Sequence, residues 1–169
     1  MLYKALAHPL AAERLAVLAR ALGEAPYALF DPDNIADALC ALAPGLARPA
    51  SVLVQDVEQL GRMRAGVATR PLIEAGRLAE RTLLVAAFDA DRVVDRLRAI
   101  VPDGVAVRSL DEARLPDALL TNGRRYLDRL NFATNFAFFR EADGLSTRLV
   151  TANYWSSYGA GAEIGRAHV

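Results

Sequence analysis

The chain has 169 residues, 53% of them hydrophobic and 24% charged, and its 20 basic residues balance its 20 acidic residues. This hydrophobic share predicts a globular, soluble protein with its own core and argues against intrinsic disorder. Proteins that bind nucleic acids or membrane surfaces use an excess of basic residues to neutralise phosphates, and this chain, with a net charge of zero, has no such excess. We therefore expect no nucleic-acid partner and no membrane partner.

Cysteine and lysine are both almost absent. Cys40 is the only cysteine, which excludes an internal disulfide and a zinc site built from cysteines. A reducing, cytoplasmic location is therefore expected. Lys4 is the only lysine, and we interpret this arginine bias as codon usage in a GC-rich, bacterial-type genome.

The first 25 residues predict an amphipathic helix rather than a signal peptide, because Glu13 and Arg14 interrupt the apolar run. Pro9 suits the first position of a helix, and Gly23 suits the left-handed residue that follows the last turn. Leucines at positions 15, 18 and 22 recur on one face of that helix. This helix is expected to cover a larger apolar surface.

From residue 26 onward the chain repeats a short apolar run, an aspartate and a helical period. The apolar runs are PYALF, SVLVQ, TLLVAAF and VAVRS, and the helical stretches are DPDNIADALCALAPG, DVEQLGRMRAG, DADRVVDRLRAIVP and LDEARLP. Pro71 opens an additional short helix in RPLIEAGRLAE. This alternation is typical of parallel sheets. We predict a Rossmann-like α/β domain over residues 1–120, a small open parallel sheet of four strands with flanking helices.

The composition changes after residue 120. Eight of the twelve aromatic residues fall between positions 126 and 158, and helical periodicity stops. The runs NFAFFRE and LSTRLVTANYW resemble strands, and Asp143-Gly144 between them favours a tight hairpin turn. Residues 121–162 are expected to begin a truncated β-rich domain, because two strands do not make a stable one.

The closing GAGAEIGRAHV raises the question of a non-native end. One allowed codon spelling of Ile164 to Val169 plus a stop matches the start of a common sequencing-library adapter, and the preceding adapter letters complete a codon for Glu163. We expect residues 163–169 to be a translated adapter, with native sequence ending near Ala162. Glycines 159, 161 and 165 then form no dinucleotide-binding loop.

The most informative functional pattern is the aspartate that closes each apolar run. In open α/β sheets ligands bind at the carboxyl ends of the strands, where carboxylates contact ribose hydroxyls, hold cations or act as general bases. Helix capping is the alternative role of each aspartate. The expected ligand-binding residues are Asp31, Asp33, Asn34, Asp56, Asp89 and Asp111, with Asp31 and Asp33 as catalytic candidates.

No motif specifies a reaction or a cofactor. Walker loops, G-x-G-x-x-G, G-x-S-x-G and H-E-x-x-H do not occur in the sequence. His8 is interpreted as a helix cap or surface residue, Cys40 as core packing, and no metal site is expected. Two functions stay open: binding of a nucleotide, sugar or phosphorylated small molecule at the sheet, or a non-catalytic scaffold whose β-rich part binds a partner protein.

Overall fold

A computed structural model describes residues 2–46 and 48–132. The chain divides into two units, Met1–Ala133 and Thr134–Val169, and the described residues lie in the first. The strands and the 3-10 turns named below therefore belong to the first unit. The hairpin expected around residues 135–155 and the translated adapter expected at residues 163–169 lie outside the described residues.

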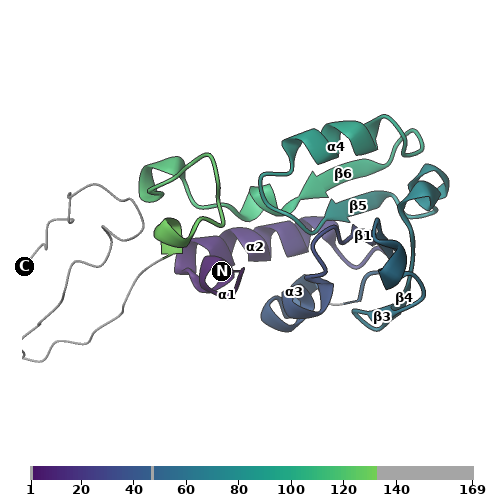
Figure 1. The fold of residues 1–169 in the computed structure, drawn as a ribbon, viewed down its shortest axis with the longest axis horizontal. Helices are drawn as coiled ribbons and strands as arrows, with labels where there is room; N and C mark the ends of the chain where they lie inside the picture. Colours follow the sequence, from purple (N-terminus) through teal and green to yellow (C-terminus); the bar gives the residue numbers. More distant parts are fainter. Residues whose placement is uncertain (1, 47, 133–169) are drawn as a thin grey trace, which may run out of the picture. The chain divides into compact units, whose positions relative to one another are not determined.

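A six-stranded sheet lies at the centre of the first unit, in the order β3-β4-β2-β1-β5-β6 (Figure 1). Five strands are parallel, and β3 is antiparallel to β4 at one edge. The strands are β1 (Ala28–Phe30), β2 (Ser51–Val54), β3 (Met63–Arg64), β4 (Val67–Pro71), β5 (Thr82–Val85) and β6 (Ala106–Ser109). The prediction of an open α/β fold is confirmed at this level.

Four α-helices and six short 3-10 turns connect and cover these strands in the described part of the chain. The α-helices are α1 (Leu2–Ala7), α2 (Pro9–Leu22), α3 (Ala36–Leu42) and α4 (Asp91–Arg98). The 3-10 turns are η1 (Pro44–Leu46), η2 (Val57–Gln59), η3 (Leu72–Arg77), η4 (Leu110–Ala113), η5 (Asp117–Leu119) and η6 (Arg129–Phe132). None of the helices described is long and apolar enough to cross a membrane.

The number of strands was predicted wrongly. The stretch DVEQLGRMRAG does not form a helix; it folds into η2 and then β3, which turns back into β4. Gly61 and Gly66 take φ values of 73° and 80°, which suit glycine because it has no Cβ. These two glycines flank β3 and let the chain turn sharply before and after it. The sheet therefore has two strands, β3 and β4, beyond the four expected.

Helix α2 begins and ends as its sequence predicts. The Nδ1 atom of His8 accepts a hydrogen bond from the Leu10 N–H at 3.3 Å, so His8 is the N-cap. Gly23 ends the helix at φ 65°, and its N–H donates to the carbonyls of Ala19 and Arg20. The amphipathic pattern is confirmed too, because Leu15, Leu18 and Leu22 are buried.

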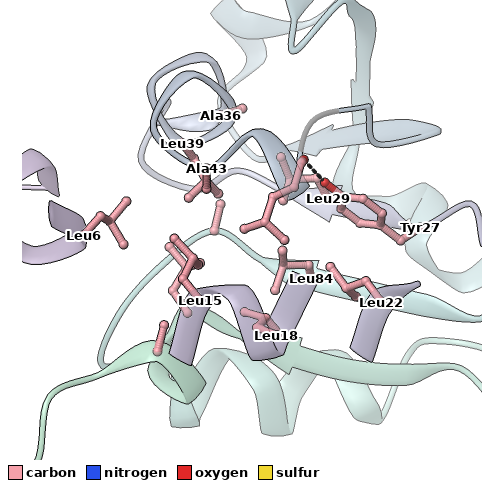
Figure 2. Close-up of a cluster of buried hydrophobic side chains, with 14 of the residues drawn as sticks. Leu6, Leu15, Leu18, Leu22, Tyr27, Leu29, Ala36, Leu39, Ala43 and Leu84 are labelled. Carbon is pink, nitrogen blue, oxygen red and sulfur yellow. Dashed lines mark hydrogen bonds between the residues drawn. The ribbon is translucent and has the colours of Figure 1, made fainter. Parts of the chain in front are cut away.

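The leucines of α2 pack on one face of the sheet. They lie against Leu29 of β1 and Leu84 of β5, while Ala36 and Leu39 of α3 close the same cluster from the other side (Figure 2). Tyr27 is buried beside them, and its hydroxyl donates a hydrogen bond to the Leu46 carbonyl. Helices α1, α2 and α3 therefore cover a single face.

The opposite face of the sheet packs against η3 and α4. Alternate strand residues such as Phe30, Leu53 and Val85 point to this side and meet Val94 and Leu97 of α4. Both faces of the central strands are thus buried, and β1 and β2 are buried at every position. This explains why their sequences are continuous apolar runs rather than alternating ones.

A third cluster joins residues 115–132 to the first two helices. Leu115, Tyr126 and Phe132 pack with Ala5 of α1 and Ala11 of α2. The rings of Tyr126 and Phe132 meet edge to face, with their centroids 5.3 Å apart. Residues 121–132, in which a β-rich region was expected to begin, contain η6 and pack on helices.

Candidate functional site

The order of the parallel strands reverses between β1 and β5. Strands β2 and β4 follow β1 on one side, whereas β5 and β6 continue the sheet on the other side. Hydrogen bonding extends one residue beyond each strand, because the Asp31 N–H donates to the Leu53 carbonyl and the Ala86 N–H donates to the Phe30 carbonyl. Ligands of open α/β sheets bind outside the carboxyl ends of the strands at such a reversal. We therefore expect a ligand-binding site at the loops that follow β1 and β5.

Asp31 stands directly after β1 and holds the start of α3. Its carboxylate accepts hydrogen bonds from the N–H groups of Ile35 at 2.8 Å and Ala36 at 3.0 Å. The side chain is buried, with the residue only 1% exposed. Burial raises the pKa of this carboxyl, although the two N–H donors and the nearby charge of Arg64 act in the opposite direction. Asp31 therefore has a structural role at the start of α3, although the N-cap position itself belongs to Ile35.

Asp33 and Asn34 occupy the tip of the same loop. Both residues are exposed, and neither makes a hydrogen bond or an ion pair within residues 2–46 and 48–132. Asn34 takes φ 57°, a left-handed conformation that asparagine tolerates better than most residues. Their polar atoms are available at the strand-order reversal, where a ligand is expected.

Asp56 follows β2 and caps the turn η2. One carboxylate oxygen accepts the Glu58 N–H at 2.9 Å, and the residue is exposed. Its second oxygen makes no hydrogen bond within the described part of the chain. Asp56 thus combines a local structural role with one acceptor that a ligand could use.

Asp89 and Asp111 lie together, but they bind the protein itself. The Asp111 carboxylate accepts the N–H groups of Asp89 and Ala90, each at 2.8 Å, and so stabilises the start of α4. Asp89 takes φ 54°, and its carboxylate accepts the Tyr126 N–H at 2.8 Å. The sequence placed both aspartates at strand ends and did not indicate that one would bind the backbone of the other.

Arg114 completes this arrangement and was missed by the sequence analysis. Its guanidinium donates to the Asp89 carboxylate at 2.6 Å and to the Gly123 carbonyl at 2.7 Å. It lies 3.7 Å from Asp111 and stacks over the Tyr126 ring at 5.1 Å from the centroid. The partners are 3 to 25 residues apart in the chain, and no local signal in the sequence identifies them.

Arg64 of β3 links the β3–β4 hairpin to α3. Its guanidinium donates to Asp37 at 3.1 Å and to the Gln59 side chain at 2.7 Å. Asp37 also accepts the Ala65 N–H at 2.7 Å. These contacts fix the hairpin against the first turn of α3, the helix that follows the β1 loop.

The other two candidates for chemistry serve the fold. His8 caps α2 as described above, and the Cys40 thiol donates to the Leu46 carbonyl at 3.5 Å. Burial raises the pKa of that thiol, which favours its inert protonated form. Among the residues that the structure describes, no group of three or more His, Cys, Asp or Glu could hold a metal ion.

Comparison with known proteins gives no family for this chain. No protein-family model matches it, and no curated protein matches it.

Proposed function

We propose that the α/β unit binds a small molecule, a nucleotide, sugar or phosphorylated ligand, outside the carboxyl ends of β1 and β5. The reversal of strand order between these two strands is the observation on which the proposal depends. The loops that follow them carry polar side chains, and those at the tip of the β1 loop have no partner in the described part of the chain.

The aspartates divide into two groups in this proposal. Asp31, Asp89 and Asp111 are engaged by backbone N–H groups, so they shape the two loops rather than contact the ligand. Asp33 and Asn34, whose polar atoms are exposed, are the ligand-binding residues. No catalytic role is assigned to Asp31, since both of its oxygens are used inside the fold.

The charge of the loops indicates which part of the ligand they contact. Asp33 and Asp56 are exposed carboxylates, and the glycine-rich turn that brings a phosphate close to the backbone does not follow β1 in this sequence. Carboxylates accept hydrogen bonds from hydroxyl groups and repel phosphates. We therefore expect the hydroxyls of a ribose or sugar to face Asp33, with any phosphate pointing away from it.

Nuclear magnetic resonance of the ¹⁵N-labelled chain tests this proposal. Adenosine, adenosine monophosphate and glucose 6-phosphate are titrated separately, and at least one is expected to give saturable shifts in the amides of residues 31–35 and 86–90. Replacing Asp33→Ala together with Asn34→Gly is expected to weaken that binding about tenfold or more, because two ligand hydrogen bonds are lost. Glycine at position 34 keeps the positive φ.

The matched control is Asp103→Ala. Asp103 is exposed and lies in the α4–β6 loop, which joins the amino end of β6, away from the proposed site. This substitution is expected to leave both the affinity and the melting temperature unchanged. The proposal is wrong if no probe gives saturable shifts, or if the shifts leave both loops unaffected.

A further inference from the structure

Strand β6 forms an edge of the sheet. Among residues 2–46 and 48–132, β5 is the only strand that pairs with it. The Ala106 N–H donates to the Arg81 carbonyl at 2.9 Å, so the backbone groups of Ala106 and Arg108 face β5. Those of Val107 and Ser109 then face outward, since peptide groups alternate along a strand. Outward N–H and C=O groups are a template for pairing with another strand.

A groove of about 430 Å³ runs beside this edge, between α4, β6 and η4. Val94 of α4 and Val107 of β6, both nearly buried, supply its apolar lining. Charged side chains of both signs surround them, and two ion pairs already neutralise part of that charge. Arg108 binds Glu112 through two hydrogen bonds of 3.0 and 2.8 Å, and Arg98 lies 3.3 Å from Asp95.

The charges on α4 have a definite order along the groove. Asp91 stands at the N-terminal end of the helix and Arg98 at the C-terminal end, and both line the groove. They are seven residues apart, which places them on the same face two turns away from each other. The N-terminal end of the groove-facing surface of α4 therefore carries Asp91, and the C-terminal end carries Arg98 beside Asp95, which also lines the groove.

A twofold axis makes such a surface complementary to itself. In a symmetric pair of copies each α4 runs antiparallel to the other, so Asp91 of one helix meets Arg98 of its counterpart. The dipoles of the two helices are also opposed in this arrangement. The same rotation aligns the two β6 edges antiparallel, which is the pairing that their outward peptide groups can accept.

We propose that β6 and α4 form the interface of a homodimer. The two β6 edges pair across a twofold axis and make one continuous sheet, and Asp91 of each copy faces Arg98 of the other. The partner is a second copy of this chain rather than an unrelated peptide, because the opposite charges at the two ends of α4 satisfy the symmetry of a twofold interface. The groove adjoins the β5 loop through Asp91 and Asp111. Its test uses no ligand, so the inference does not depend on the proposed ligand site.

Sedimentation velocity of the full 169-residue chain over a range of concentrations tests the interface. The unmodified protein is expected to sediment as a dimer. Asp91→Arg and Arg98→Asp are each expected to weaken the dimer about tenfold or more, because each replaces two symmetry-related attractions with repulsions. The double variant, which restores opposite charges in the reverse order, is expected to regain most of the lost affinity.

Arg96→Asp is the matched control, since Arg96 is an exposed arginine of the same helix that does not line the groove. It is expected to leave the dimer intact, and circular dichroism verifies that every variant is folded. A monomeric unmodified protein at all concentrations overturns the proposal. A double variant that stays as dissociated as the single variants overturns it too, because rescue is specific to contact between positions 91 and 98.

Discussion

The aspartates on the two sides of the sheet centre bind backbone N–H groups at different separations along the chain. On the β1 and β2 side, Asp31 and Asp56 bind N–H groups two to five residues further along the chain. On the β5 and β6 side, Asp111 binds N–H groups 21 and 22 residues earlier, and Asp89 binds an N–H group 37 residues later. The same residue type after a strand therefore binds the start of the next helix or turn in one half and joins distant segments in the other.

This difference affects what each contact stabilises. A local cap stabilises the first turn of the helix or turn that it begins, and its loss affects little beyond that turn. The contacts of Asp89, Asp111 and Arg114 hold the start of α4, the residues after η4 and the backbone around Gly123 and Tyr126 in one arrangement. Removing one of these long-range contacts is therefore expected to lower the free energy of unfolding by more than removing a local cap does.

Arg114→Ala gives the largest expected effect. It removes the guanidinium from the Gly123 carbonyl and leaves three neighbouring carboxylates, Asp89, Asp111 and Asp117, without their cation. The Arg114 side chain is 20% exposed, so we expect a loss of about 2–3 kcal/mol in the free energy of unfolding. Urea denaturation measures this loss.

The matched control for that prediction is Arg108→Ala. Arg108 also binds a carboxylate through two hydrogen bonds, but its partner Glu112 is four residues away and exposed. An exposed pair of this kind contributes about 0.5 kcal/mol. If the two substitutions lower the free energy of unfolding equally, the long-range contacts of Arg114 stabilise the fold no more than an exposed local ion pair does.

Asp31 gives a smaller effect that depends on pH. Because burial raises its pKa above 3.8 in the folded protein, the folded state binds the proton more tightly than the unfolded state. The stability gained from protonated Asp31 is present below pH 3.8 and is lost as the pH rises through the raised pKa. The Asp31→Asn variant has no carboxyl to ionise at this position and lacks this dependence.

The measurement is the free energy of unfolding of the natural chain minus that of Asp31→Asn, taken from urea denaturation between pH 3.5 and 7. This difference is expected to fall as the pH rises, because titrations common to both proteins cancel. A difference that rises with pH would mean that the N–H donors from Ile35 and Ala36 outweigh burial and lower the pKa.

The sequence was sufficient for the parts of the fold that depend on local patterns. The apolar runs predicted β1, β2, β5 and β6, and proline and glycine predicted the ends of α2. Strand β4 was missed because its sequence, VATRP, mixes polar and charged residues at an edge of the parallel sheet, where only the central Thr69 is buried. The glycines around β3 were interpreted as part of a helix, although their positive φ values belong to a turn.

For the candidate site, the sequence predicted where the aspartates would stand but not what they would bind. The Asp31 carboxylate accepts N–H groups at the start of α3 only four and five residues away, a range that a local rule can anticipate. The role of Arg114 depends on three carboxylates and a carbonyl brought together by folding. Nothing in LDEARLP distinguishes this arginine from one on a solvated surface.

The central claim is that the strand-end aspartates divide into residues that hold the fold and residues that are free for a ligand. Urea denaturation of Asp89→Asn beside Asp33→Asn tests it most directly, since asparagine tolerates the left-handed conformation of position 89 and preserves size at both sites. We expect Asp89→Asn to lower the free energy of unfolding by about 1–3 kcal/mol, through loss of a charged acceptor for Arg114. Asp33→Asn is expected to change it by less than about 0.5 kcal/mol. Equal losses at the two positions would contradict the division.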